Sequence, residues 1–276
     1  MHSVEANGAS IPALGLGTWT LKGKECSGLV AEALRVGYRH VDTAAAYGNE
    51  EAVGEGLRAS GVARDAVFVT TKVWWTDLGA ADLRRSAEAS LSRLGLDAVD
   101  LLLIHWPNPA IPLAETVAAL NRAREEGLAR HIGVSNFPTA LLREAIALSD
   151  APLVANQVEH HPYLDQSKVR AVCEAAGMAL VGYCPLHRGG GLLQEPVIVE
   201  AARAHGRTPG QIVLRWHVQQ PGTVAIPRTS RKERLTENAA IFDFALSEAE
   251  MAAISALGAA ANRICDYDFS PEWDPA

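Results

Sequence analysis

The sequence lacks an apolar run long enough to cross a membrane. No stretch approaches the ~18 consecutive apolar residues of a spanning helix, and the first residues, MHSVEANGAS, lack the basic and then apolar pattern of a secretion signal. Basic residues are also scarce, since 25 lysines and arginines against 32 aspartates and glutamates leave a net charge of −7. Binders of nucleic acid or membrane surfaces are normally basic. We therefore expect a cytoplasmic protein whose partner is a small molecule.

Cysteines are few and widely separated. They are Cys26, Cys173, Cys184 and Cys265. Without a C-x-x-C pair, this pattern predicts neither a disulfide framework nor a zinc site. The adjacent histidines His160 and His161 are a weak metal candidate, because neighbours on a strand point to opposite faces and no third ligand suggests itself. We expect no metal site.

Extended and helical patterns alternate along the chain. Asn7-Gly8 is a typical two-residue hairpin turn, so residues 1–10 predict a short hairpin. Eight β-like runs follow: LGLGTW, YRHVDT, AVFVTTKVW, AVDLLLIHW, RHIGVSNF, LVANQVEHHP, MALVGYCP and GTVAIPR. Amphipathic patterns between them predict helices such as 79–95 and 113–127. Thr208-Pro209 and Ser247-x-x-Glu250 are typical of helix N-termini.

Eight strand–helix units in 276 residues leave roughly 34 residues for each, which suits one strand, one helix and two connections. We therefore predict a single α/β domain over residues 1–276, a (β/α)8 TIM barrel with the hairpin capping its bottom. An open doubly wound sheet is the main alternative. That fold lacks support here, because no G-x-G-x-x-G follows the first predicted strand.

In such a barrel the active site is built at the carboxyl ends of the strands. Asp42 ends the second predicted strand, with Tyr47 in the following loop, and Lys72 and His105 end the third and fourth. Singly, these residues could be a turn cap, a loop anchor, a surface cation and a core histidine. Together they form one acid–base system. We expect Lys72 to lower the pKa of Tyr47, Asp42 to balance the charge of Lys72, and His105 to orient a carbonyl oxygen.

Long motifs extend this interpretation. They are GYRHVDTAAAYGNEEAVGEGLR, TTKVW, LIHWP, IGVSNF and IPRTSRKERLTEN. In order and spacing they resemble the aldo-keto reductase superfamily over essentially the whole chain. The resemblance implies a monomeric barrel with nicotinamide bound at its top and a catalytic tetrad of Asp42, Tyr47, Lys72 and His105. In that family the equivalent tyrosine protonates the carbonyl oxygen as hydride arrives from the cofactor, so an aldehyde or ketone becomes an alcohol.

The same resemblance implies a nicotinamide site. Ser135, Asn136 and Gln157 match positions that hold the carboxamide, and Tyr183 matches the ring that stacks on the nicotinamide. Helix capping and core packing are the alternatives. The remaining cofactor positions around the ring are Thr18, Asp42, Cys184, Pro185, Leu186 and Ile226.

A basic segment follows the eighth predicted strand, where barrels commonly bind phosphate. Its cations are Arg228, Arg231, Lys232 and Arg234. A solvated basic face is the alternative. By resemblance, Arg228, Thr229 and Arg234 hold the adenosine 2′-phosphate, and Glu237 and Asn238 contact adenine. A guanidinium suits phosphate well, so we expect NADPH, with weaker use of NADH left open because the family more often has lysine and serine at 228 and 229.

Tryptophans predict the substrate pocket. Trp19, Trp74 and Trp106 follow strand ends and should line an apolar mouth above Tyr47 and His105. We expect Trp75 and Trp216 to be packing residues. The tail DYDFSPEWDPA is short, which predicts a short C-terminal loop and an open pocket. Together with the compact predicted barrel, the SPEWD ending resembles bacterial 2,5-diketo-D-gluconate reductases, which also reduce methylglyoxal and other dicarbonyls.

Two other functions stay open at this point. A barrel that binds NADPH as a redox sensor would share the fold and the cofactor site but would turn over little. A metal-dependent hydrolase would need a cluster of histidine and aspartate ligands at the strand ends, where this sequence has a lysine. The sequence also leaves open whether Arg188, in the loop CPLHRGGG, reaches the cofactor pyrophosphate or faces solvent.

Overall fold

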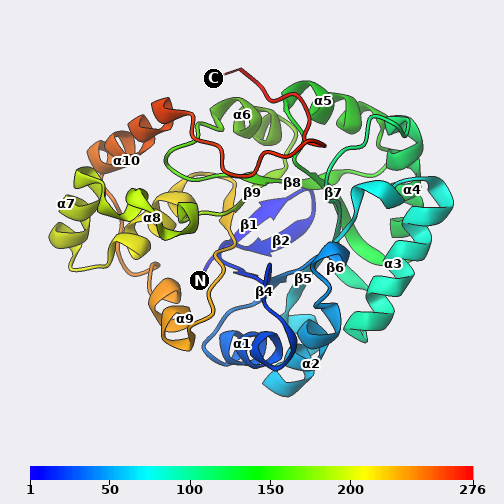
Figure 1. Ribbon diagram of the computed structural model, residues 1–276, viewed down its shortest axis with the longest axis horizontal. Helices are drawn as coiled ribbons and strands as arrows, with labels where there is room; N and C mark the ends of the chain where they lie inside the picture. Colours follow the sequence, from blue (N-terminus) through cyan, green and yellow to red (C-terminus); the bar gives the residue numbers. More distant parts are fainter. Residues whose placement is uncertain (276) are drawn as a thin grey trace.

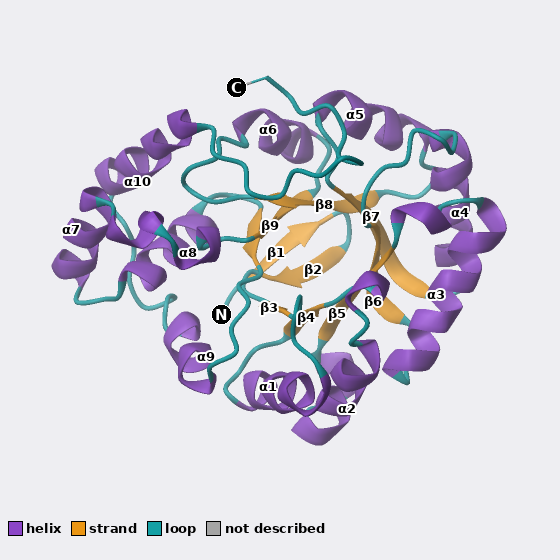
Figure 2. Ribbon diagram, viewed as in Figure 1, coloured by secondary structure: helices purple, strands orange, loops and turns teal. Residues whose placement is uncertain are grey.

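A curled sheet of eight parallel strands lies at the centre of the computed structural model, which describes residues 1–275. Helices surround it on the outside (Figure 2). In chain order the strands are β3 (Leu16–Gly17), β4 (His40–Asp42), β5 (Phe68–Val73), β6 (Val99–Ile104), β7 (Ala129–Ser135), β8 (Leu153–Glu159), β9 (Ala179–Tyr183) and β10 (Thr223–Ala225). Each strand pairs with the next along the chain, and each corresponds to one predicted run, so the predicted strands are confirmed.

The two edges of this sheet meet. A parallel bridge joins Leu14, just before β3, to Ala225 at the end of β10. Gly15 N–H donates to the Ala225 carbonyl at 2.9 Å, and Gly17 N–H donates to the Pro227 carbonyl at 3.0 Å. The arrangement is consistent with a (β/α)8 barrel and disfavours an open doubly wound sheet.

The helices follow the predicted pattern. They are α1 (Gly23–Arg35), α2 (Glu50–Ser60), α3 (Ala80–Leu94), α4 (Leu113–Glu125), α5 (Thr139–Leu148), α6 (Ser167–Ala175), α7 (Pro196–His205), α8 (Pro209–Gln219), α9 (Lys232–Ala239) and α10 (Glu248–Ser255). Both predicted N-termini are capping boxes, with Thr208 before α8 and Ser247 before α10. None of the helices within residues 1–275 has the length and apolar character needed to cross a membrane.

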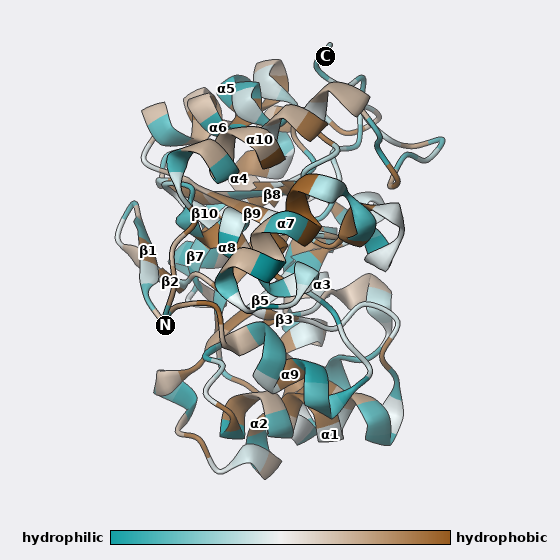
Figure 3. Ribbon diagram, turned by 90° about the vertical axis from the view of Figure 1, so that its left-hand side faces the viewer, coloured by the Kyte–Doolittle hydropathy of each residue, from teal (hydrophilic) through white to brown (hydrophobic). Residues whose placement is uncertain are grey.

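The predicted N-terminal hairpin is present, with β1 (Ser3–Ala6) and β2 (Ala9–Pro12). Positive φ angles at Asn7 (46°) and Gly8 (88°) suit the primed turn that an Asn-Gly pair favours. The Asn7 amide donates to the carbonyl of Leu153, the first residue of β8, at 2.8 Å. Figure 3 shows the hairpin at one end of the sheet. The hairpin therefore covers the end where the strands begin, leaving the opposite end for a site.

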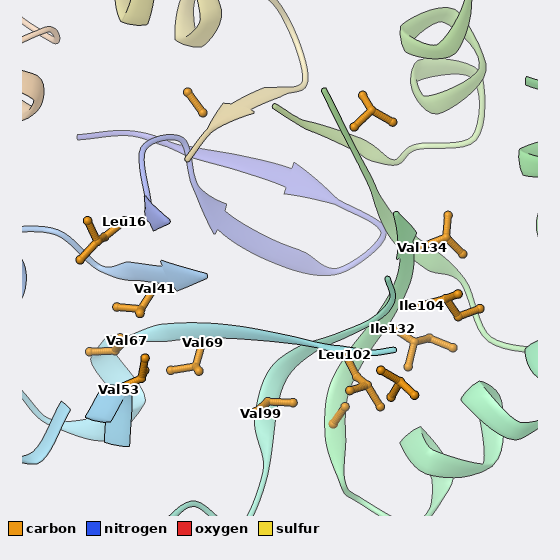
Figure 4. Packing of buried hydrophobic residues seen from close by; sticks show 14 of the residues in the cluster. Leu16, Val41, Val53, Val67, Val69, Val99, Leu102, Ile104, Ile132 and Val134 are labelled. Carbon is orange, nitrogen blue, oxygen red and sulfur yellow. The ribbon is translucent and has the colours of Figure 1, made fainter. Parts of the chain in front are cut away.

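Side chains along each strand point alternately outward, to the core between sheet and helices, and inward, to the interior of the curled sheet. On β5, Val69 and Val73 pack outward in the main core cluster, with Val41, Leu102 and others drawn in Figure 4. Each such buried aliphatic side chain contributes roughly 1.5–3 kcal/mol. Lys72, directly before Val73, points the other way, into the sheet interior, where it is fully buried. The strand pattern therefore delivers a charged group to the interior.

The C-terminal segment, residues 261–275, folds back across the end of the sheet. In Figure 1 it is drawn in red and passes beside α5 and α6. The Asp274 carboxylate accepts hydrogen bonds from the Thr139 backbone at 2.9 Å and hydroxyl at 2.6 Å. Near the start of this segment, the backbone N–H groups of Ile264 and Cys265 donate to the carboxylate of Glu159 at the end of β8, each at 2.7 Å. The segment is thus fixed above the strand ends.

Candidate active site

A pocket of about 1390 Å³ lies at the carboxyl ends of the strands. Most of the predicted site residues line it: Thr18, Trp19, Asp42, Tyr47, Trp74, His105, Trp106, Ser135, Asn136, Gln157, Tyr183, Cys184, Pro185, Leu186, Ile226, Arg228 and Arg234. Lys72 lies buried directly beneath, in contact with two of them. Side chains separated by more than two hundred positions in the sequence, such as Thr18 and Arg234, therefore share one concave site.

Asp42, Lys72 and Tyr47 form a connected group at the pocket floor. The Lys72 ammonium donates to the Asp42 carboxylate at 2.6 Å and to the Thr43 carbonyl at 2.8 Å. It also donates to the Tyr47 hydroxyl at 3.4 Å. Strands β4 and β5 are adjacent, which places the ends carrying Asp42 and Lys72 together. The expected charge balance between these two residues is confirmed by this ion pair.

The pKa of Tyr47 is raised, not lowered as we expected from the neighbouring Lys72. Burial raises the pKa of Tyr47 well above its usual value, and the negative charge of Asp42 raises it further. The ion pair with Asp42 offsets part of the positive charge of Lys72, so burial and the Asp42 carboxylate outweigh the stabilisation that Lys72 gives to the phenolate. Burial also lowers the pKa of Lys72. Tyr47 therefore holds its proton, which is the state that a proton donor requires.

His105 lies beside Tyr47 as a neutral imidazole. Its pKa is held well below the usual value by burial, with a smaller contribution from the Lys72 cation. Its ring meets those of Trp74 and Tyr47 edge-on, with centroids 5.1 Å and 5.6 Å away. Within residues 1–275 its Nδ1 has no hydrogen-bond partner. A neutral imidazole can donate a hydrogen bond to a ligand oxygen without bringing a positive charge into the pocket.

Ser135, Asn136, Gln157 and Tyr183 form a polar network on one wall. The Tyr183 hydroxyl donates to the Asn136 side-chain oxygen at 2.8 Å, and the Asn136 amide donates to Ser135 Oγ at 3.1 Å. The Gln157 amide donates to Asp42 at 2.7 Å, which connects the network to the pocket floor. Asn136 has a positive φ of 63°, which asparagine tolerates better than most residues. The wall is a largely buried surface that carries amide and hydroxyl groups.

The basic segment borders the pocket only in part. Arg228 is exposed, and the Arg234 side chain is 40% exposed, and both line the pocket rim. Thr229, Glu237 and Asn238 do not line it. The Glu237 carboxylate instead accepts from the Thr208 hydroxyl at 2.8 Å. The structure therefore brings the two arginines, and not the three other predicted residues, to the pocket.

The tryptophans lie largely as expected. Trp74 and Trp106 form the apolar side of the pocket, while Trp19 stands at the mouth with 44% of its surface exposed. Trp216 is buried in a cluster between helices, which confirms it as a packing residue. Trp75 stacks on Phe269 of the C-terminal segment, with ring centroids 5.2 Å apart.

Among the pocket residues that the sequence interpretation missed, three belong to the C-terminal segment. Cys265, Tyr267 and Phe269 of the C-terminal segment line the pocket. The Phe269 ring meets Trp106 edge-on at 5.4 Å, so the short tail covers part of the mouth. Aromatic residues in a tail without strand or helix periodicity were the available signal.

The position of Arg188, which the sequence left open, is defined by two contacts. Its guanidinium lies over the Trp19 ring at 5.2 Å and donates to Cys265 Sγ at 3.6 Å.

The paired histidines have separate surroundings. The His160 ring packs against Trp216 and His217, with centroids 5.1 Å and 4.7 Å away. His161 forms a hydrogen bond with Glu159 at 2.8 Å. Within residues 1–275 no group of three or more histidine, cysteine, aspartate or glutamate side chains is arranged to hold a metal ion.

Comparisons with known proteins agree on one family. Residues 13–259 match the Aldo/keto reductase family. The chain is 42% identical to glyoxal reductase of Bacillus subtilis over 252 residues, covering 91% of this chain and 90% of the relative. It is also 42% identical to morphine 6-dehydrogenase of Pseudomonas putida over 269 residues, covering 91% and 89%.

Solved structures give the same result. A structure assigned as a 2,5-diketo-D-gluconic acid reductase B superposes with a TM-score of 0.96 at 46% identity, covering 100% of this chain and 98% of that one. An aldo-keto reductase of Bombyx mori in complex with NADP superposes with a TM-score of 0.90 at 34% identity, covering 98% and 97%. By these matches, the chain belongs to the aldo/keto reductase family of oxidoreductases.

Proposed function

We propose that this protein reduces aldehydes and ketones to alcohols with NADPH, and that Tyr47 is the proton donor. The observation that carries the proposal is the position of the Tyr47 hydroxyl on the pocket floor, 3.4 Å from the Lys72 ammonium. The ring of His105 stands beside it, 5.6 Å between centroids. These groups surround a point where a carbonyl oxygen can accept two hydrogen bonds.

Each residue has a distinct role in the proposed mechanism. The cofactor, when bound, supplies the hydride. Neutral His105 donates a hydrogen bond that orients the carbonyl oxygen. Tyr47 protonates that oxygen as it becomes an alkoxide, which is more basic than a phenolate and so takes the proton even from a tyrosine of raised pKa. Lys72, held by Asp42, stabilises the phenolate left behind. Such acid catalysis typically contributes ~10²–10⁴-fold.

The pocket fits the proposed cofactor. Its volume of about 1390 Å³ exceeds what a small carbonyl needs alone. Ser135, Asn136 and Gln157 would bind the carboxamide, with Tyr183 stacked on the ring. The further proposed contacts to the nicotinamide half come from Thr18, Asp42, Cys184, Pro185, Leu186 and Ile226.

The rim arginines favour NADPH over NADH. Arg228 and Arg234 present guanidinium groups at the edge of the pocket, where a 2′-phosphate would gain charge-assisted hydrogen bonds. Thr229 would add a hydroxyl, and Glu237 and Asn238 would contact adenine after local adjustment, since they do not line the pocket now. NADH, without the phosphate, would bind more weakly.

The proposed substrates are small polar carbonyls, such as methylglyoxal, 2,5-diketo-D-gluconate and other α-dicarbonyls. Trp74, Trp106 and the exposed Trp19 provide flat apolar walls, with Tyr47 and His105 below. The names of two relatives, a glyoxal reductase and a 2,5-diketo-D-gluconic acid reductase, support the same class. The short C-terminal loop narrows the mouth through Phe269 and so favours compact substrates.

The proposal extends to the domain organisation, oligomeric state, cellular location and partners of the enzyme. We infer one barrel domain over residues 1–276, of which Ala276 lies outside the described residues. We also infer a monomer in the cytoplasm whose partner is its carbonyl substrate rather than nucleic acid or membrane. The net charge of −7 supports the choice of a small-molecule partner.

Loss of reduced-nicotinamide absorbance tests this function. The purified protein would be given NADPH, and separately NADH, with methylglyoxal, 2,5-diketo-D-gluconate, an aromatic aldehyde or an aldose. Rapid oxidation of NADPH by a dicarbonyl, with slower oxidation of NADH, is the expected result. Tight NADPH binding without turnover on any carbonyl would instead favour a redox sensor, and absence of NADPH binding would overturn the cofactor assignment.

A further inference from the structure

Two cysteines meet inside the pocket. Cys184 follows Tyr183 at the end of β9, and Cys265 lies 81 positions later in the C-terminal segment. Their sulfur atoms are 4.0 Å apart, within hydrogen-bond distance for thiols. Both residues line the pocket. A disulfide needs the sulfurs about 2 Å closer, so its formation requires the two side chains to rotate towards each other.

A cation stands beside this pair. The Arg188 guanidinium donates to Cys265 Sγ at 3.6 Å, and its positive charge favours the thiolate form of both cysteines. The hydrogen bond from Cys265 is the largest effect on Cys184 and lowers its pKa; Arg188 acts in the same direction, while burial and the Glu159 carboxylate oppose it. The same bond raises the pKa of Cys265. An adjacent cation and an opening to a pocket are both common around thiolate nucleophiles.

The two remaining cysteines provide a contrast within the same chain. Cys26 in α1 and Cys173 in α6 are buried in the main core cluster. Burial raises the pKa of Cys26 to about 11 and that of Cys173 to about 12. Neither lines the pocket. Small reagents that enter the pocket can therefore reach one pair of thiols and not the other.

We propose that Cys184 and Cys265 are an oxidisable dithiol that reacts with small hydroperoxides to form an intramolecular disulfide. This inference does not depend on the carbonyl reductase activity. It follows from the contact between the sulfurs, the adjacent arginine and the access through the pocket.

The reaction balances in two steps. The Cys184 thiolate attacks the terminal oxygen of a hydroperoxide ROOH, the O–O bond breaks, and the leaving alkoxide takes a proton to become ROH. The sulfenic acid on Cys184 is then attacked by the Cys265 sulfur, which forms the S–S bond and releases water. Two thiols lose two electrons in total, and the peroxide gains them.

The disulfide would add a covalent link between two parts of the pocket that hydrogen bonds to Glu159 already hold near each other. Cys184 belongs to the strand end next to Tyr183, and Cys265 begins the stretch that carries Tyr267 and Phe269. Oxidation would make the attachment of that stretch covalent, and a dithiol reductant would remove the covalent link.

Peroxide titration of the reduced protein tests the proposal. Free thiols are counted with a chromogenic disulfide after denaturation, and peptides are identified by mass spectrometry without reduction. From four cysteines, we expect two thiols to remain after one equivalent of hydrogen peroxide and a single cross-linked peptide pair containing Cys184 and Cys265. Survival of all the thiols, or a link involving Cys26 or Cys173, would overturn the proposal.

Variants separate this outcome from general oxidation. In Cys265→Ser the sulfenic acid on Cys184 has no resolving partner, so a dimedone adduct at Cys184 should replace the cross-link. The matched control, Cys173→Ser, should form the same Cys184–Cys265 link as the parent. Arg188→Gln should slow thiol loss several-fold, because each unit of pKa changes the thiolate fraction about tenfold. A dimedone adduct on Cys265 rather than Cys184 in the parent would reverse the assigned order of attack.

Discussion

The pocket floor and the basic segment on the pocket rim are built in opposite ways. Lys72 is 0% exposed, and its ammonium has carboxylate, carbonyl and phenol oxygens around it. Arg234 on the rim is 40% exposed, and its nearest acidic partner, Glu237, is 3.6 Å away. One group of charges is held in place before any ligand arrives. The other can change its partners when a ligand binds.

This difference in burial means that the two groups of charges contribute differently to the free energy of folding. A buried ion pair depends on its partner, because a lone buried charge is costly. An exposed pair contributes at most about 1 kcal/mol and is screened by salt. Substitutions on the floor should therefore affect stability and chemistry together, whereas substitutions on the rim should affect ligand affinity alone.

Replacement of Lys72 should have the largest effect on stability. Lys72→Met leaves the Asp42 carboxylate buried without its cation, which should cost about 3–5 kcal/mol in the free energy of unfolding. Urea unfolding followed by circular dichroism measures this loss. The double variant Lys72→Met/Asp42→Leu should recover part of it, since both charges are then absent.

The rim supplies the matched control for that experiment. Arg234→Met removes a cation of similar length from a side chain that is 40% exposed. Its free energy of unfolding should change by less than about 1 kcal/mol. Equal losses for the two methionine variants would remove the distinction between floor and rim.

Buried histidines should make the interior sensitive to acid. Burial lowers the pKa of His40 to about 4 and that of His217 to about 3, against 6.5 for an unperturbed histidine. Below pH 6.5 the unfolded chain binds protons that the folded chain does not, so stability falls as pH falls. At pH 5 each residue should lower the free energy of unfolding by about 2 kcal/mol. Urea unfolding at pH 7.5 and pH 5 should show this loss, and His217→Asn should reduce it.

The smallest effect should come from the rim. Arg234→Ala should weaken NADPH about tenfold, corresponding to one charge-assisted hydrogen bond, and should leave NADH binding nearly unchanged. Fluorescence titration measures both constants. Arg231→Ala is the control, because its side chain is 66% exposed and does not line the pocket. Equal losses for NADPH and NADH would exclude a 2′-phosphate role for Arg234.

The sequence predicted most of the floor and the frame around it. Strand periodicity placed Asp42, Lys72 and His105 at neighbouring strand ends, because the carboxyl ends of parallel strands must meet at one edge. Capping residues such as Thr208 and Ser247 marked helix starts through local hydrogen bonds alone. These features follow from short-range rules, and the structure has them.

Long-range contacts were harder to predict. The tail residues Cys265, Tyr267 and Phe269 have no periodicity that assigns them to the pocket, and only the folded chain brings them there. The direction of the Tyr47 pKa shift was also mistaken, because it depends on burial and on how fully Asp42 balances Lys72. Neither quantity can be derived from the order of residues along the chain.

Hydride transfer in a single turnover tests the central claim most directly. Enzyme with NADPH already bound is mixed with methylglyoxal, and the loss of reduced nicotinamide is followed for the parent and for Tyr47→Phe, whose NADPH affinity is measured separately. If Tyr47 donates the proton, the variant should bind NADPH nearly as well as the parent but transfer hydride at least about 10²-fold more slowly. Transfer at the parent rate would contradict the assignment and place the proton donor elsewhere in the pocket.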